Sequence, residues 1–242
     1  MVSVFLDIAI GDIKAFEEQK AHYDKARTWV QQWGSTYGFP SNDLDEFESS
    51  HRETLRDILA NDPSTQSFRV EPPVSLRGGR LVIDLFDKDC PKTCENFRAL
   101  CVGGKIGKNS KKPLHYKDTR LFRLVPNFMV QGGDVTRGDG SGGESIYNGS
   151  FNDEKPGLAK KFTQKGIVAM ANSGKNSNTS QFFITLADPS VNPKTFEKAN
   201  GKYVIFGQVT QGLEVLQSIN DVPVVKEQPT LDVTVTDCGE QS

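Results

Sequence analysis

Apolar and polar residues alternate at the start of the chain, where Val4, Leu6, Ile8 and Ile10 occupy every second position. This period of two residues is typical of a β-strand with one apolar face. The alternation returns over residues 80–86. Further strands are predicted at 121–125, 128–132, 166–171, 181–186, 203–209 and 231–238, and helices at 92–101 and near 213–219. Short strands at this spacing favour a mainly β fold, either a closed antiparallel barrel or a sandwich.

Between the first two strands the apolar period becomes that of a helix. One stripe runs from Ile13 to Trp33, and a second follows the cap-like sequence at 40–43 and ends before Pro63. Two amphipathic helices joined by a short turn make a helical hairpin. We therefore predict a hairpin whose second helix starts after Asp43, followed by a linker over 64–79.

The composition is that of an ordinary globular chain of 242 residues, with a net charge of -2 and a pI near 6.0. This balance argues against a protein that binds nucleic acid by covering phosphates. The first residues lack a cationic region, and Asp7 interrupts the apolar run. We therefore predict no signal peptide, no contact with a membrane and a cytoplasmic location. We also expect a monomer.

Cysteine usage points to no disulfide framework and no metal site. The chain has four cysteines, Cys90, Cys94, Cys101 and Cys238. They are too few for a small secreted fold held together by disulfides, and they lack the C-x-x-C spacing of metal ligands. Cys90 and Cys94 lie four residues apart, and we interpret them as packing residues. We expect neither a metal nor a cofactor.

The stretch 120–134 combines a cation, an amide and several apolar groups. Alternation would place Leu121, Arg123 and Val125 on one face of a strand, with Phe122 and Leu124 on the other. After a turn come Phe128, Met129 and Gln131, and then Gly132 and Gly133, which allow another backbone to approach closely. Taken alone, the pattern fits an arginine beside an apolar pocket, and it also fits an arginine that caps the end of a barrel.

Seven segments in order carry a recognisable pattern: 4–9, 91–100, 126–134, 140–147, 170–172, 180–184 and 204–207. Together they resemble the cyclophilins, a family of peptidyl-prolyl isomerases. The resemblance covers residues 2–10 and 79–240. It implies an eight-stranded antiparallel barrel closed by two helices and formed by residues 1–10 and 79–242. In the family a short turn joins the first two strands, so residues 11–78 are interpreted as an inserted helical hairpin and linker.

The resemblance implies a peptidyl-prolyl cis-trans isomerase, or rotamase, that acts on X-Pro bonds of proteins and assists folding as a chaperone. Rotation about such a bond is slow because amide resonance must be broken, at a barrier of about 20 kcal/mol. A catalyst needs a pocket for the proline ring and a donor for the nitrogen lone pair that forms in the transition state. By resemblance Arg123 is that donor, and Gln131 orients it.

The same resemblance implies the contacts of a proline-containing protein or peptide substrate. Its proline pocket is expected from Val125, Phe128, Met129 and Phe183. The substrate strand is expected beside Gly140, Ala171, Asn172, Ser173 and Gln181. The opposite wall is expected at Lys198, Ala199 and Tyr203. A second pocket is expected from small residues: Ser141, Gly149, Ser150, Ser173, Ser177 and Ser180.

Several departures from the family pattern lie near these residues, among them Ala199 in place of a leucine and Tyr203 in place of a histidine. Lys198 stands where many members carry the tryptophan that contacts the drug cyclosporin. We therefore predict that cyclosporin binding is weak or absent while isomerase activity is kept. Phe122 stands where the family often has histidine, and alternation points it away from Arg123, so we expect little effect on the rate.

Residues 107–116 resemble the additional loop of the divergent-loop cyclophilins. That subgroup also carries two cysteines and a glutamate, which Cys101, Cys238 and Glu144 match. Its two cysteines can form a disulfide that lowers activity, so a redox pair is one hypothesis for Cys101 and Cys238. The other is two reduced, partly buried thiols.

An interaction module is the alternative class of function. The barrel would then bind a proline-containing partner with little turnover, while residues 11–78 dock a second protein. The aromatic residues Phe16, Trp29 and Trp33 either make that contact or merely pack one helix against the other. An exposed apolar patch would favour docking.

Overall fold

The computed structural model describes residues 2–241, which form two compact units. One contains residues 2–11 and 77–241, and the other contains residues 12–76. The chain leaves the first unit at the end of β1 (Ser3–Ile10) and returns at the start of β2 (Arg77–Leu85), where Ile10 pairs with Arg77. β2 begins before the expected end of the linker, because its first residues already pair with β1.

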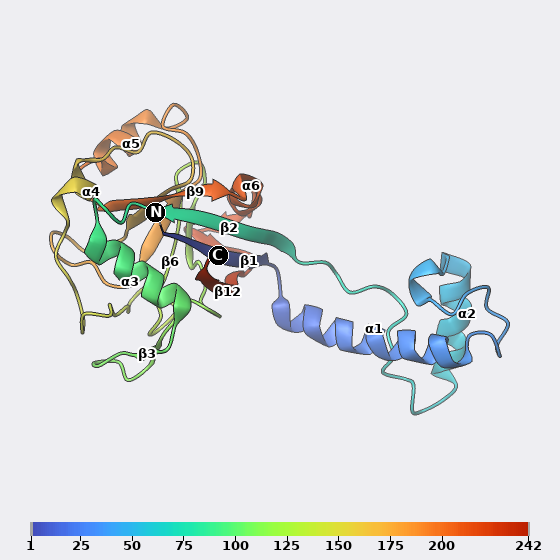
Figure 1. The fold of residues 1–242 in the computed structure, drawn as a ribbon. Coiled ribbons are helices and arrows are strands. Elements are labelled where there is room, and N and C mark those ends of the chain that lie inside the picture. The colour runs from blue at the N-terminus through green and yellow to red at the C-terminus, as the bar shows by residue number, and fades with distance from the viewer. Residues whose placement is uncertain (1, 242) are drawn as a thin grey trace. The chain divides into compact units, whose positions relative to one another are not determined.

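Within residues 2–241, eight strands of the first unit form one sheet in the order β12-β1-β2-β9-β7-β8-β6-β5. Figure 1 shows β1 beside β2 and β12 in this sheet. The six further strands are β5 (Arg123–Val125), β6 (Met129–Gly132), β7 (Ile167–Met170), β8 (Phe182–Thr185), β9 (Ile205–Gln211) and β12 (Val233–Glu240). All neighbours are antiparallel. A bridge between Arg120 and Thr234 links the chain before β5 to β12, so the sheet curls until its two ends meet. The predicted mainly β, antiparallel fold is confirmed.

Two helices predicted from the sequence cover this sheet. α3 (Pro91–Val102) packs against β12, β1 and β9, and α6 (Leu213–Asn220) packs against β2. Proline is favoured in the first helical turn, and Gly103 ends α3 at a φ of 77°. The remaining elements are short: α4 (Lys155–Ala159), α5 (Pro193–Ala199), and the hairpins β3 (Lys105–Ile106) with β4 (Pro113–Leu114) and β10 (Val224–Val225) with β11 (Gln228–Pro229).

The barrel core contains the apolar face predicted for the first strand, because Val4, Leu6, Ile8 and Ile10 are all buried. Another row of core residues crosses four strands. Register places Leu124 opposite Val130, Val130 opposite Ile184 and Ile184 opposite Val168, and all four are fully buried. Side chains of successive residues point to opposite faces of a strand. The neighbours of this row therefore lie on the outer face of the sheet.

The prediction that Leu121 shares a face with Arg123 is wrong. Leu121 is 1% exposed and belongs to the core, whereas Arg123 is exposed. The regular strand begins only at Arg123, while the backbone of Leu121 bonds to Val233 of β12. The chain changes its pairing partner between these two residues, and this interrupts the alternation.

The second unit contains α1 (Ile13–Trp33), the single turn η1 (Leu44–Glu46) and α2 (Ser49–Ala60) around its own apolar core. The prediction that the second helix starts after Asp43 is wrong. Asp43 caps only η1, and Phe47 is extended, with φ -74° and ψ 129°. The core residues are Tyr23, Ala26, Val30, Leu44, Phe47, Leu55, Leu59 and Val70.

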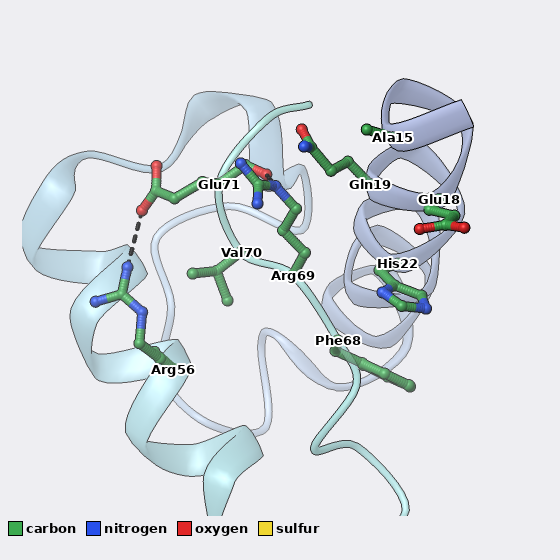
Figure 2. Close-up of a pocket in the computed structure, with 9 residues that line it drawn as sticks. All are labelled: Ala15, Glu18, Gln19, His22, Arg56, Phe68, Arg69, Val70 and Glu71. Atoms are coloured by element: carbon green, nitrogen blue, oxygen red, sulfur yellow. Dashed lines mark hydrogen bonds and ion pairs between the residues drawn. The ribbon is translucent and has the colours of Figure 1, made fainter. Parts of the chain in front are cut away.

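Residues 68–71 cross the second unit between α1 and α2 and border an open hollow of about 480 Å³ (Figure 2). Arg69 donates its backbone N–H to the carbonyl of His22 on α1. Glu71 accepts a bond of 2.9 Å from Arg56 on α2, drawn as a dashed line in Figure 2. The extended segment thus ties the two helices together.

Candidate active site

The outer face of β5, β6, β8 and β7 carries the residues that the sequence singled out for chemistry. Register places Arg123 opposite Gln131, Gln131 opposite Phe183 and Phe183 opposite Ala169. Residues opposite one another in neighbouring strands have side chains on the same face. A cation, an amide and an aromatic ring therefore lie side by side.

A chain of hydrogen bonds orients the guanidinium of Arg123. Arg123 donates from Nη1 to Oε1 of Gln131 at 3.3 Å, and Gln131 donates from Nε2 to Oε1 of Gln181 at 2.9 Å. Gln181 in turn donates from Nε2 to the carbonyls of Gly140 and Gly142, at 2.9 and 2.7 Å. These hydrogen bonds connect Arg123 to Gly140 through Gln131 and Gln181. Gln181 therefore helps to fix the orientation of Gln131.

The loop 134–143 is held by Asp134, a buried carboxylate that the sequence analysis did not single out. Its Oδ2 accepts bonds of 3.0 Å from the N–H groups of both Gly140 and Gly142. Its Oδ1 accepts from Thr136 and Arg137. Burial alone would raise the pKa of Asp134, but the backbone donors outweigh it and hold the pKa below its ordinary value. Asp134 thus fixes the two carbonyls that hold Gln181.

An apolar cluster borders the guanidinium on the same face. It contains seven predicted residues: Val125, Phe128, Met129, Ala171, Phe183, Ala199 and Tyr203. Phe183 contacts Tyr203 edge to face at 5.1 Å between ring centroids. Val125 and Met129 are opposite one another in β5 and β6. The cluster supplies the apolar surface that a proline ring needs.

Phe162 and Phe196 also belong to this cluster, although they were not among the predicted site residues. Phe128 packs edge to face on Phe196 at 5.3 Å, and Phe162 lies 5.7 Å from Phe183. Both residues come from segments without a clear period of two residues or of a helix. Their apolar character among polar neighbours was the only signal in the sequence.

Lys198 does not belong to the apolar cluster. It is exposed in the last turn of α5, while its neighbour Ala199 is buried. Phe196, three residues before Ala199, lies on the same side of this short helix and is also buried. The wall expected at Lys198, Ala199 and Tyr203 is therefore built by Phe196, Ala199 and Tyr203.

Asn172 and Ser173 lie beside the apolar cluster and border a hollow of about 520 Å³ with Tyr203. Asn172 donates from Nδ2 to the carbonyl of Lys202 at 3.1 Å. The N–H of Ser173 donates to the hydroxyl of Ser177 at 3.0 Å. Tyr203 contributes to both the hollow and the cluster, so a chain lying over the cluster would also reach Asn172.

Residues 73–240 match the model of the family described as cyclophilin type peptidyl-prolyl cis-trans isomerase/CLD. The chain belongs to this family. It is 48% identical over 165 residues to peptidyl-prolyl cis-trans isomerase 9 of Caenorhabditis elegans, an alignment that covers 67% of this chain and 50% of that protein. The chain thus spans about half the length of this relative. The family match starts at residue 73 and therefore does not include β1. In the structure β1 nevertheless belongs to the same sheet, where it pairs with both β12 and β2.

The second pocket of this cyclophilin domain is more charged than expected. A hollow of about 500 Å³ includes the predicted Ser141 and Gly149, but it also includes Lys112, Arg137 and Glu144. The other predicted residues lie elsewhere. Ser180 is fully buried and accepts the N–H of Glu144, Ser173 and Ser177 bond to each other, and Ser150 does not line the hollow. Of the six residues predicted for the second pocket, this hollow contains Ser141 and Gly149, together with charged side chains.

Glu144 anchors the loop 107–112 of this cyclophilin domain. Its two carboxylate oxygens accept the N–H groups of Asn109 and Ser110, each at 2.8 Å. Burial would raise the pKa of Glu144, but these hydrogen bonds lower it below its ordinary value. His115, near the end of the predicted loop 107–116, contacts the carbonyl of Cys101 at the end of α3 through Nε2, at 3.2 Å. The segment 107–116 is therefore held at Asn109 and Ser110 and again at His115.

All four cysteines are free and buried. Burial raises the pKa of Cys101 well above its ordinary value, and the nearby Cys238 adds to the shift. Burial also raises the pKa of Cys238 to about 12. The thiolate is the reactive form of cysteine, so both side chains are held in their unreactive form near neutral pH.

Among residues 2–241 no group of three or more histidine, cysteine, aspartate or glutamate side chains is arranged to bind a metal ion. Within the same residues no helix is long and apolar enough to cross a bilayer.

Proposed function

We propose that this domain catalyses the cis/trans isomerisation of X-Pro bonds in proteins and peptides. The observation that carries the proposal is the position of Arg123, an exposed guanidinium oriented by Gln131 beside the apolar cluster of Phe128, Met129 and Phe183. This combination of a cation and an apolar surface suits substrate chains that contain proline.

The chemistry requires no nucleophile and no proton transfer. When the X-Pro bond twists, the proline nitrogen regains a lone pair and its amide resonance is lost. A guanidinium is always charged and donates in a fixed planar geometry, so Arg123 can stabilise this lone pair. The apolar cluster holds the proline ring while the acyl side rotates. Donors in place before the reaction stabilise the transition state without reorganising.

The proposal is tested by measuring isomerisation of an Ala-Pro peptide with the wild type, Arg123→Ala and Arg123→Lys. Arg120→Ala is the matched control, because Arg120 is also an exposed arginine but pairs with Asp232. We expect Arg123→Ala to lower kcat/KM by about a hundredfold or more, of the order found for removal of one preorganised donor. Arg120→Ala should stay near the wild-type value. A wild type with no activity above the uncatalysed rate would refute the proposal.

A role in protein folding follows from this activity, since X-Pro isomerisation limits the folding of many chains. We also propose that residues 107–116 form the additional loop of the divergent-loop subgroup. The anchoring of Asn109 and Ser110 by Glu144 supports this assignment. The cytoplasmic location and the monomeric state stay predictions from the sequence.

A second candidate function is attachment of the domain to another protein through residues 12–76. The supporting observation is that the aromatic stripe of α1 is only partly used in packing. Trp33 at the end of α1 is 43% exposed and Tyr37, in the turn after α1, is 54% exposed, while Tyr23, Ala26 and Val30 fill the core. Replacing residues 12–76 by a two-residue turn tests the division of roles. Unchanged isomerase activity would assign the insertion to recognition, and lost activity in a folded barrel would assign it to catalysis.

A further inference from the structure

Arg123 has a second partner that no sequence pattern indicated. Its Nε donates to Oε2 of Glu227 at 2.7 Å, while Nη1 donates to Gln131. An arginine carries five N–H groups, so three remain free for another acceptor. The guanidinium is therefore held from two directions, by an amide on its own sheet and by a carboxylate from a hairpin far along the chain.

Glu227 lies in the two-residue turn between β10 and β11. Lys226 and Glu227 have φ angles of 50° and 63°, so both are in the left-handed region. Such turns favour asparagine and glycine, because other side chains are strained at positive φ. The chain nevertheless places a lysine and a glutamate here. Local backbone strain of this kind is often found at functional sites.

The backbone of this turn is attached to the strand that carries Arg123. The N–H of Leu124 donates to the carbonyl of Glu227 at 2.8 Å. Leu124 follows Arg123 directly and its side chain is fully buried in the core. The backbone from which the Glu227 carboxylate extends is thus fixed by a main-chain bond to a rigid strand. This distinguishes the pair from an ordinary surface ion pair between two long, mobile side chains.

We infer that Glu227 is a positioning residue that holds Arg123 in the orientation required for catalysis, an inference that rests on the proposed isomerase function. Both side chains are about half exposed, at 45% and 52%, so solvent weakens their attraction. The contribution of Glu227 therefore comes from restricting the rotamers of Arg123. Because Glu227 holds the donor rather than the substrate, its removal should lower kcat and leave KM nearly unchanged.

Two substitutions separate hydrogen bonding from charge. Glu227→Gln keeps an oxygen that can accept from Nε of Arg123, whereas Glu227→Ala removes it. We expect Glu227→Ala to lower kcat about three- to fivefold with KM within about twofold. Glu227→Gln should restore most of this loss. Glu240→Ala is the matched control, since Glu240 is a similarly exposed partner of Arg98 on another face.

A spectroscopic measurement tests the contact itself. In ¹⁵N-labelled protein the Nε–H signal of Arg123 should shift in Glu227→Ala, and its proton should exchange faster with water. The Nε–H signal of Arg98 should stay unchanged. Glu227→Gly provides a further variant, because glycine adopts the turn conformation without strain. It should fold at least as stably as the wild type and still show the loss of kcat.

Wild-type kcat in Glu227→Ala, or an equal loss in Glu240→Ala, would overturn the inference while leaving the isomerase function intact. An inactive wild type would instead refute the proposed function. In that case an unchanged Nε–H signal of Arg123 in Glu227→Ala would separately refute the contact.

Discussion

Gln131 donates a hydrogen bond from Nε2 to Oε1 of Gln181 at 2.9 Å, and this bond connects two parts of the site. On one side Gln131 accepts from Arg123. On the other, Gln181 is held by the carbonyls of Gly140 and Gly142. The orientation of the guanidinium therefore depends on a loop as well as on its own strand.

Removing either glutamine should weaken catalysis. Gln181→Ala breaks the support of Gln131, and we expect kcat/KM to fall about tenfold, as for loss of about 1.4 kcal/mol from a hydrogen bond. Gln131→Ala should act similarly. The double variant should lose no more kcat/KM than the more damaging single variant, because both substitutions break the same series of hydrogen bonds. The measurement is the isomerisation assay, with Gln66→Ala in the insertion as control. Additive losses would show that the two residues act independently.

Asp134 should make stability depend on pH under acidic conditions. Its folded pKa is below the ordinary value of 3.8, so its stabilisation is fully present above that value. It is lost as pH falls below 3.8 and through the folded pKa, because the unfolded chain binds the proton more readily. Asp134→Asn should lower the free energy of unfolding at pH 7 by about 2 kcal/mol. It should also make this free energy depend less on pH below pH 4.

Urea unfolding at pH 7 and at several values below pH 4 measures this effect. Asp118→Asn is the control, because Asp118 is an exposed aspartate of the same unit. Wild-type stability of Asp134→Asn at pH 7 would contradict the assigned role of Asp134.

Arg52 should hold the insertion together. Its guanidinium donates to the carbonyls of Leu44 and Phe47, at the two ends of η1, and to the carbonyl of Val70 in the extended segment 68–71. Arg52→Ala should destabilise the insertion by about 2 kcal/mol or more, because it removes three hydrogen bonds from a charged donor to partly buried carbonyls. Lysine cannot reach all three, so Arg52→Lys should be only slightly better.

Fluorescence isolates this transition, because both tryptophans of the chain, Trp29 and Trp33, lie in the insertion. Isomerase activity reports the barrel separately and should persist. Arg56→Ala, which breaks an exposed ion pair with Glu71, should change stability by less than about 1 kcal/mol. Equal effects of Arg52→Ala and Arg56→Ala would rule out the special role of Arg52.

The thiols should react slowly in the folded protein. Burial raises the pKa of Cys90 and of Cys238 from 9.0 to about 12, which lowers the thiolate fraction near neutral pH about a thousandfold. An aromatic disulfide reagent should modify all four cysteines quickly only in denaturant. Oxidation to a Cys101–Cys238 disulfide should then require α3 to loosen from β12. Rapid loss of activity with mild oxidant, with this disulfide found by mass spectrometry, would instead support the redox-pair hypothesis.

Cyclosporin should inhibit this domain weakly. The wall of the apolar cluster is formed by Phe196, Ala199 and Tyr203, and the exposed Lys198 stands where the family resemblance expects the tryptophan that contacts the drug. Lys198→Trp should strengthen inhibition at least about tenfold without changing the uninhibited rate. Lys194→Trp on the same helix is the control. Nanomolar inhibition of the wild type would refute the prediction.

Local patterns were sufficient for the elements that carry strong signals. The alternation of Val4, Leu6, Ile8 and Ile10 predicted a buried strand face, and Pro91 with Gly103 marked the ends of α3. Short elements without a period were missed, including α4 and α5. Asp43 predicted a helix start that became a single turn, because Phe47 had to turn into the core of the insertion.

The sequence by itself determined the fold class, the family resemblance and most residues of the face that carries Arg123, since these depend on periodicity and on short motifs. The sequence named Gln131 as the residue that orients Arg123, but only the tertiary structure showed that Glu227 also holds Arg123 and that Gln181 and Asp134 support Gln131. Asp134, Gln181 and Glu227 come from separate segments and meet through sheet register and loop closure. Contacts between residues distant in sequence leave no periodic trace along the chain, because their spacing depends on how the whole barrel closes.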